Sequence, residues 1–288
     1  MKIIKYFIEA FFIYIFFLFI KIIGLKYSRK IFAKIFNFIG PLIKSKDIVN
    51  SNIDRVFGDC GEKKRREIID NMWNNYGMTF VEYLYLNKFK KSSSHINIKG
   101  IHILEEIKRK KKPVIFISGH FANYELMSME LIKRNLNLAT IYRPLNNYFL
   151  NPFMEYVRRK YVCKNQIKKG IVGIREVVQF LKKDYSIALM VDQRVSEGKK
   201  LPFFNENALT TTLPAQISLK YNYDIIPISI KRNSNNTFDM EIMSPVRSID
   251  RKNSDKNRLN VSLEINKIIE KMLLTNPNQW IWTHNRWK

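Results

Sequence analysis

The sequence predicts an α/β fold: a mixed, mostly parallel sheet flanked by helices, with an N-terminal hydrophobic membrane helix. From residue 93 onward, short apolar runs rich in β-branched residues alternate with segments of helical periodicity. This alternation is typical of a mostly parallel sheet with helices on its faces. We therefore divide the chain into an anchoring helix at residues 1–26 and a single domain at residues 27–288. In that domain, residues 27–92 are expected to be helical and residues 93–288 to form the α/β core.

The bulk composition adds two constraints. The 288 residues carry 50 basic and 25 acidic side chains, a net charge of +25. Such a surplus favours polyanionic partners, namely nucleic acid, an anionic membrane face, phosphorylated substrates or an acidic protein. Compositional drift explains part of it, since Lys, Ile and Asn are all abundant. Cys60 and Cys163 show neither metal-ligand spacing nor a disulfide framework, which indicates a reducing compartment or indifference to redox conditions.

The N-terminus is expected to attach the protein to a membrane. Residues 10–20 are uninterrupted apolar residues between Glu9 and Lys21. No small-residue cleavage site follows, which argues against a signal peptide. The run is shorter than the ~20 residues of a perpendicular span, so it spans only if Glu9 and Lys21 snorkel, and a helix lying in the interface is equally supported. The heavier positive charge after the run favours placing the remaining chain in the cytoplasm.

Periodicity predicts the elements of the domain. Helices are expected at residues 27–42 (ended by Pro41), 62–86, 101–109, 124–134, 151–161, 170–182, 213–221 and 257–274. Strands are expected at residues 96–98, 114–117, 138–142, 186–191, 224–230 and 238–243. The aromatic stripe within residues 62–86 is interpreted as core, and residues 88–94 as an exposed connection.

The chain is organised around residues 113–125. The strand at residues 114–117 leads to Gly119, which permits a sharp turn, and to His120. Asn123 is a candidate N-cap for the following helix, which carries Glu125 in its first turn. A histidine and a carboxylate brought together at a strand-to-helix turn form a natural general base with its orienting partner.

Two further strands end in residues capable of chemistry. Tyr142-Arg143-Pro144 closes one strand and Asp192-Gln193-Arg194 another. Ligands of open α/β sheets bind beyond the carboxyl ends of the strands, so the three ends are expected to meet in one cleft. Taken alone, each signal is weak. A lone histidine is more often structural, Asp192 is equally suited to capping a turn, and Arg143 to the surface.

Taken together, the motifs resemble one family. They are, in order, His120-Phe-Ala-Asn-Tyr-Glu125, Tyr142-Arg-Pro144, Asp192-Gln193, Pro202-Phe-Phe204, Thr210-Thr-Thr212 and Gln279-Trp-Ile-Trp-Thr-His-Asn-Arg-Trp287. This ordered set resembles the late lipid A acyltransferases, the lauroyl and myristoyl transferases of Gram-negative bacteria, within the lysophospholipid acyltransferase superfamily. The resemblance covers nearly the whole chain. Ala122 stands where many relatives have Gly; we expect an ordinary backbone conformation there and retained activity.

The resemblance implies a reaction and roles for residues. The donor would be a fatty acyl thioester on acidic acyl carrier protein, and the acceptor the hydroxyl of a hydroxyacyl chain on a phosphorylated glucosamine disaccharide. His120 would act as the base, Glu125 would orient its imidazole, and Arg158 (or its neighbour Arg159) would stabilise the oxyanion. Substrate-binding candidates are Arg143, Asp192, Gln193, Arg194, Thr211 and Thr212, with Thr210 beside them.

The same resemblance bears on the remaining features. No metal and no cofactor other than the acyl carrier protein thioester is expected. An apolar tunnel would measure the acyl chain. His284 is interpreted as structural, and the Trp-rich tail is expected to close the sheet or lie at the membrane surface.

Alternatives remain open. One is an acyltransferase for another membrane lipid (a lysophospholipid, an aminolipid or a glycolipid), because the His-x-x-x-x-Glu element alone indicates only the superfamily. A non-catalytic, membrane-bound polyanion binder would satisfy the charge alone. No nucleic-acid-binding module is evident, so we expect no nucleic-acid partner.

Overall fold

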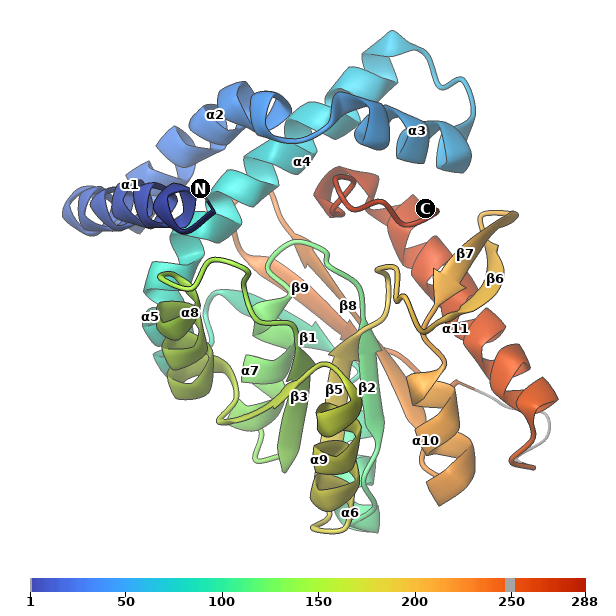
Figure 1. Cartoon of the computed structure of the whole chain (residues 1–288). Helices are drawn as coiled ribbons and strands as arrows, with labels where there is room; N and C mark the ends of the chain where they lie inside the picture. Colours follow the sequence, from blue (N-terminus) through green and yellow to red (C-terminus); the bar gives the residue numbers. More distant parts are fainter. Residues whose placement is uncertain (1, 247–251) are drawn as a thin grey trace.

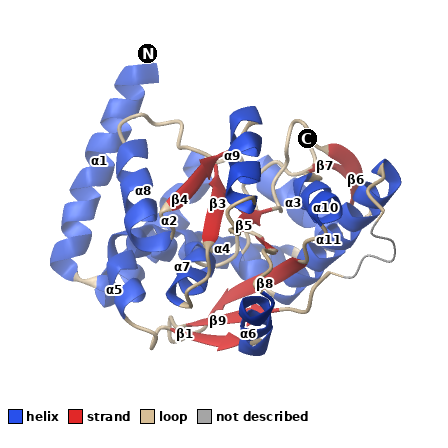
Figure 2. Ribbon diagram, turned by 90° about the horizontal axis from the view of Figure 1, so that it is seen from below, coloured by secondary structure: helices blue, strands red, loops and turns tan. Residues whose placement is uncertain are grey.

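A seven-stranded sheet forms the centre of the protein (Figures 1 and 2). The computed structural model describes residues 2–246 and 252–288. In spatial order the strands are β1 (Ile96–Lys99), β9 (Phe238–Ile242), β8 (Ile225–Arg232), β2 (Ile115–Ser118), β5 (Ser186–Met190), β3 (Leu138–Tyr142) and β4 (Asn165–Lys168). All neighbouring pairs are parallel except β8 and β9. The predicted mixed, mostly parallel sheet is thus confirmed.

The sheet is buried on both faces, which explains its apolar strands. Successive residues of a strand point to opposite faces. Accordingly, Ile115 and Ile117 of β2 join one core cluster, whereas Phe116 joins another. The helices of this core are α6 (Ile101–Lys110), α7 (Glu125–Lys133), α8 (Asn151–Val157), α9 (Ile171–Leu181), α10 (Leu213–Tyr221) and α11 (Asp255–Thr275). Each was predicted to within a few residues.

Helices of the N-terminal part cross the carboxyl edge of the sheet (Figure 1). They are α2 (Leu25–Ile43), α3 (Lys46–Phe57) and α4 (Glu62–Glu82), followed by α5 (Leu86–Lys91). Gly77 of α4 is needed for close packing against α2, because a Cβ there would lie 2.1 Å from the Phe32 carbonyl oxygen. Met72 and Trp73 are buried, as the aromatic stripe predicted. Pro41 does not end α2, which continues to Ile43.

Several elements escaped prediction. The strand β4 contains a single β-branched residue, and the hairpin β6 (Lys199–Phe203) with β7 (Glu206–Thr210) is rich in polar residues. Helix α3 was also not predicted, although Val49 and Ile53 on one of its faces are buried in the core. The exposed connection expected at residues 88–94 is wrong in part, because α5 occupies its first half and buries Phe89.

The apolar helix α1 (Lys2–Ile23) is long and apolar enough to cross a membrane, and most of its side chains are exposed. It also contacts the domain along its length. The Asn147 amide donates to the Tyr6 carbonyl near one end, and Lys21 donates to the Leu84 carbonyl near the other. Midway, the Tyr14 hydroxyl donates to the Phe149 carbonyl at 2.8 Å. The helix therefore packs beside the domain instead of projecting from it.

Candidate active site

The three predicted strand ends meet at one cavity. Strands β2, β5 and β3 are consecutive in the sheet and parallel, so their carboxyl ends lie at the same edge. A cavity of about 540 Å³ opens there, and residues following each of the three strands line it. His120, Arg143 and Arg194 are among them. The convergence expected from the sequence is therefore present in the structure.

His120 is held by Asp192. The Nδ1 atom of His120 lies 2.7 Å from Asp192 Oδ1, and the His120 backbone N–H donates to Asp192 Oδ2 at 2.9 Å. Burial by itself raises the pKa of Asp192, but His120 and the Trp280 indole lower it to about 2. An ionised Asp192 accepts the Nδ1 proton, which leaves Nε2 as the ring nitrogen with a free lone pair.

The expected orienting partner, Glu125, is used differently. Its Oε1 accepts from Arg158 Nε at 2.7 Å and from the Tyr83 hydroxyl at 2.6 Å. Both carboxylates border the same site, but the His120 ring bonds to Asp192. The expected pairing of His120 with Glu125 is therefore wrong. Glu125 lies in the first turn of the following helix and binds Arg158. Asp192 follows the neighbouring strand β5 and binds the His120 ring.

Arg158 lines the cavity, whereas Arg159 is exposed and is absent from the lining. Arg158 opens a π-helical turn, Arg158–Val162, that follows α8. Burial alone lowers the pKa of this guanidinium, but Glu125 and Tyr83 raise it above its usual value. Within the described part of the chain, its hydrogen bonds use Nε and Nη2, and Nη1 makes none. Such turns are frequent at functional sites.

The remaining predicted residues separate into two groups. Arg143, Gln193, Arg194 and Thr211 line the cavity. Asp192 lies beneath His120 and is buried, so it is not placed to touch a substrate. Thr212, at the N-cap position of α10, lies outside the lining, and its hydroxyl accepts a hydrogen bond from the Gln216 side-chain amide.

Lys169 and His284 are among the lining residues that were not predicted as site residues. Lys169 follows β4, and recognising that strand would have placed it at the same edge as the others. His284, interpreted as structural, lines the cavity with its carbonyl bonded to Asn52. Burial lowers the pKa of His284 to about 4, so its imidazole is neutral at neutral pH.

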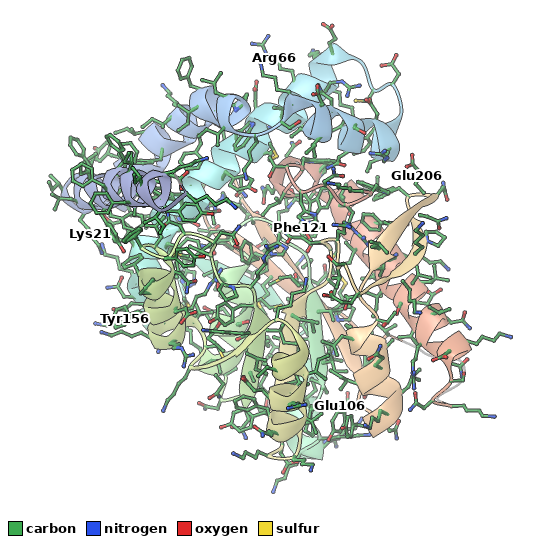
Figure 3. The ribbon with its side chains drawn as sticks, viewed as in Figure 1. Lys21, Arg66, Glu106, Phe121, Tyr156 and Glu206 are labelled. Atoms are coloured by element: carbon green, nitrogen blue, oxygen red, sulfur yellow. The ribbon has the colours of Figure 1, made fainter. Side chains whose placement is uncertain are left out.

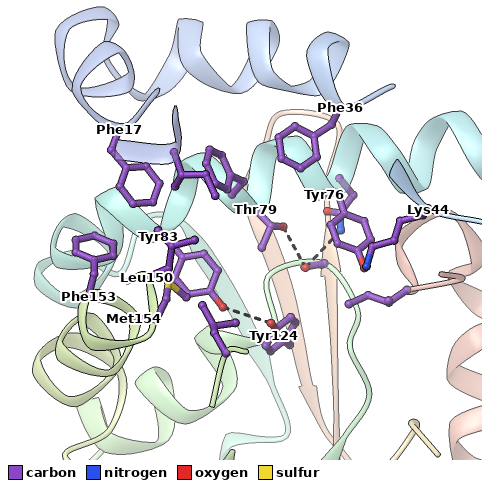
Figure 4. Close-up of a pocket in the computed structure, with 16 residues that line it drawn as sticks. Phe17, Phe36, Lys44, Tyr76, Thr79, Tyr83, Tyr124, Leu150, Phe153 and Met154 are labelled. Atoms are coloured by element: carbon purple, nitrogen blue, oxygen red, sulfur yellow. Dashed lines mark hydrogen bonds between the residues drawn. The ribbon is translucent and has the colours of Figure 1, made fainter. Parts of the chain in front are cut away.

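A second, apolar cavity of about 510 Å³ adjoins the first (Figure 4). The two cavities share Lys44, Tyr124 and Leu145. Residues of α1, α2, α4 and the segment 145–154 line it, among them Ile13, Phe17, Phe36, Phe80, Leu150, Phe153 and Met154. The Tyr83 and Tyr124 hydroxyls lie 3.3 Å apart at its inner end, beside Glu125. The cavity that contains His120 therefore adjoins an apolar one.

The turn between His120 and Glu125 is fixed by the C-terminal tail and by α4. Phe121, near the centre of Figure 3, is buried and bridges Trp280. Ala122 has φ +47°, so the ordinary conformation expected there is wrong, and its carbonyl accepts from Asn75 and Thr79. Asn123 does not cap the helix; its amide donates to Glu82 Oε2 at 2.8 Å.

The Trp-rich tail closes the interior of the molecule. Trp280 and Trp282 are buried, which excludes the membrane-surface position for these two rings. The Trp280 indole donates to Asp192 Oδ2 at 2.8 Å, so the tail supports the His120 pair directly. Among the described residues, no three His, Cys, Asp or Glu side chains gather so as to hold a metal ion.

Known proteins of similar sequence belong to one family. The family model described as bacterial lipid A biosynthesis acyltransferase matches residues 1–288. The lipid A biosynthesis palmitoleoyltransferase of Escherichia coli (strain K12) is 25% identical over 261 residues, covering 86% of this chain and 80% of the relative. The lauroyltransferase of the same strain is 20% identical over 246 residues, covering 84% and 78%. The chain belongs to the bacterial lipid A biosynthesis acyltransferase family.

Proposed function

We propose that this lipid A acyltransferase moves a fatty acyl chain from an acyl carrier protein thioester to the hydroxyl of a hydroxyacyl chain on a phosphorylated glucosamine disaccharide. The observation that carries the proposal is the position of His120. Its imidazole, held by Asp192, faces a polar cavity that shares three residues with an apolar one. A base between a polar and an apolar chamber suits a reaction that joins a sugar-linked hydroxyl to a fatty acyl group.

The chemistry follows from the hydrogen bonds of the site. Nε2 of His120 accepts the proton of the acceptor hydroxyl as its oxygen attacks the thioester carbonyl, and Asp192 stabilises the imidazolium that forms. The Arg158 guanidinium, fixed by Glu125 and Tyr83, stabilises the tetrahedral oxyanion through Nη1. When the carbon–sulfur bond breaks, the imidazolium returns the proton to the leaving thiolate. In this scheme Glu125 contributes by holding the Arg158 guanidinium in position.

The two cavities divide the substrates between them. The apolar cavity takes the acyl chain, because its lining is aromatic and aliphatic and includes Phe17 of α1. The acceptor's phosphate and sugar groups fit the polar cavity, where Arg143, Arg194 and Lys169 supply positive charge. In addition, Arg194 Nε is buried and makes no hydrogen bond with the described residues, so it is available to an incoming anion.

The charge and the apolar helix suit the partners. The net charge of +25 would steer docking of an acidic acyl carrier protein and attract an anionic leaflet. The exposed apolar side chains of α1 would hold the enzyme at the inner membrane, with the domain in the cytoplasm. The lipid acceptor would then reach the site from the bilayer.

The test is acyl transfer by the purified full chain in neutral detergent. Acyl–acyl carrier protein is offered with either the hydroxyacylated, phosphorylated disaccharide precursor or a lysophospholipid, and products are identified by mass spectrometry. We expect transfer to the disaccharide and its loss in His120→Ala. Transfer that survives His120→Ala would rule out the catalytic assignment. Transfer to the lysophospholipid alone would instead identify an acyltransferase for another membrane lipid.

A further inference from the structure

A third cavity lies at the same edge of the sheet, on the other side of the turn that carries His120. It measures about 610 Å³ and is lined by α2, α4, the β8–β9 turn and the residues before Trp280. It shares Asn75 with the apolar cavity but no residue with the catalytic one. We refer to it as the Arg29 cavity.

The lining of the Arg29 cavity is unusual in its chemistry. Four basic residues line it: Arg29, Lys30, Lys34 and Arg232. The others include the carboxamides of Asn71, Asn74, Asn75, Asn233, Asn236, Asn278 and Gln279. None of the described residues that line it is acidic. Basic groups bind phosphate, and carboxamides both donate to and accept from hydroxyl groups.

The buried side of the Arg29 cavity carries more positive than negative charge. Arg29 and Arg232 are both buried, and both pair with the single carboxylate of Glu82, which is 0% exposed. The Arg29 Nε and Nη2 atoms both lie 2.7 Å from the same oxygen, Glu82 Oε1. Two guanidinium groups against one carboxylate leave one positive charge in excess, and burying such a charge is costly unless an anion meets it. Burial lowers the pKa of Arg29, and Arg232 lowers it further against the pull of Glu82.

The position of the cavity suggests where its ligand comes from. Lys30 and Lys34 are exposed on α2, which begins directly after the apolar helix α1. A ligand at the membrane surface would therefore reach the rim of the cavity. The cavity is also linked to the turn that follows His120. The Gln279 side chain exchanges hydrogen bonds with the backbone of Arg232, and the backbone carbonyl of Gln279 accepts from the Ala122 N–H.

From these contacts we infer that the Arg29 cavity is a second anion site, distinct from the catalytic cavity, which binds a phosphate ester carried on a hydroxyl-bearing headgroup. Arg29 and Arg232 supply buried positive charge, and Lys30 and Lys34 add positive charge at the rim. The carboxamides recognise the hydroxyl groups of the headgroup. Such a headgroup belongs either to a glycerophospholipid or to a phosphorylated sugar. Occupancy would neutralise the buried charge and steady the strand end that supports Ala122.

Binding is measured without turnover, so the test is independent of the acyl transfer proposed above. The full chain in neutral detergent is titrated calorimetrically with inorganic phosphate, glycerol 3-phosphate and glucose 1-phosphate. We expect the two esters to bind more tightly than inorganic phosphate, and the preferred ester identifies the source of the headgroup. Lys30→Gln/Lys34→Gln should weaken ester binding about tenfold, because two charge contacts at the rim are lost.

Three further variants distinguish this site from the general surface charge and from the catalytic cavity. Lys182→Gln/Lys183→Gln removes the same charge from exposed positions after α9 and should leave binding unchanged. Arg194→Gln, in the catalytic cavity, should also leave this binding event in place. Asn71→Ala/Asn278→Ala keeps the charge and should erase the preference for esters over inorganic phosphate. Equal binding by wild type and Lys30→Gln/Lys34→Gln, or loss only in Arg194→Gln, would overturn the inference.

Discussion

Asp192 Oδ1 lies 2.7 Å from His120 Nδ1, although the two residues are 72 positions apart in the chain. The pairing of the parallel strands β2 and β5 brings them together, because Ser118 stands opposite Met190 two residues before each of them. Glu125, which is close to His120 in sequence, binds Arg158. Two carboxylates thus serve two different groups of one site, the imidazole and the guanidinium.

The indole of Trp280 should matter for catalysis through Asp192. Trp280→Phe keeps most of the buried ring but removes the donor to Asp192 Oδ2. We expect turnover to fall about tenfold and stability by about 1 kcal/mol at neutral pH. Trp282→Phe is the matched control, since Trp282 is equally buried but donates to the Pro277 carbonyl. Equal losses of turnover in both variants would contradict this role.

The same variant has a pH signature. Contacts that lower the pKa of Asp192 to about 2 stabilise the folded state above its ordinary pKa of 3.8, and this contribution disappears as the pH falls through about 2. The stability difference between wild type and Trp280→Phe should therefore be full above pH 4 and shrink towards pH 2. Thermal unfolding in detergent across this range measures it; a difference that grows on acidification would refute it.

Arg158 should act mainly on the transition state. Arg158→Ala removes the guanidinium that reaches the cavity, so kcat should fall by about 10²-fold or more with little change in donor affinity. Arg159→Ala provides the control, because Arg159 is exposed and outside the lining. Steady-state kinetics with acyl–acyl carrier protein distinguish the two. Parallel losses in kcat and donor binding would indicate a docking role instead.

Phe17 should determine which acyl chain length the enzyme prefers, because this side chain of α1 lines the apolar cavity. The centroids of the Phe17 and Phe80 rings lie 5.3 Å apart. Phe17→Trp fills part of the cavity, and the ratio of kcat/KM for a short over a long acyl donor should rise about tenfold. Phe12→Trp adds the same group at an exposed position on the same helix. An unchanged ratio in Phe17→Trp would place the acyl chain elsewhere.

Ala122 should be less favourable than glycine, because its φ of +47° lies in the left-handed region. Ala122→Gly removes that strain and should stabilise the protein by about 0.5–1 kcal/mol, after the greater freedom of glycine in the unfolded chain is allowed for. Ala139→Gly in β3, where no positive φ is needed, should destabilise it. Thermal unfolding of both variants decides; a lower melting temperature for Ala122→Gly would contradict this expectation.

Much of the fold was predictable because its elements are locally consistent. The strand at residues 114–117 is apolar and rich in β-branched residues, the strand at residues 186–191 is mostly apolar, and the long helices have clear periodicity. The convergence of three strand ends followed from a general property of parallel sheets. The four residues of β4 contain no such signal, and they form a strand because they pair with β3.

The pairings inside the site were not predictable in the same way. Periodicity places His120 and Asp192 at strand ends, but only the strand order makes β2 and β5 neighbours. The left-handed conformation of Ala122 and the capture of Asn123 by Glu82 depend on α4 crossing the turn, a contact between distant segments. Local sequence rules do not contain these partners, which is why the expectations for Ala122 and Asn123 were wrong.

The most direct test of the role of Asp192 compares Asp192→Asn with Glu125→Gln in single-turnover acyl transfer to the disaccharide precursor, with thermal unfolding as a check on folding. Asp192→Asn removes the charge that orients His120 and stabilises its imidazolium, so the rate should fall by roughly 10²–10⁴-fold. Glu125→Gln acts only through Arg158 and should cost about tenfold. A folded Asp192→Asn enzyme near wild-type rate, with Glu125→Gln inactive, would show instead that Glu125 is the partner of the base.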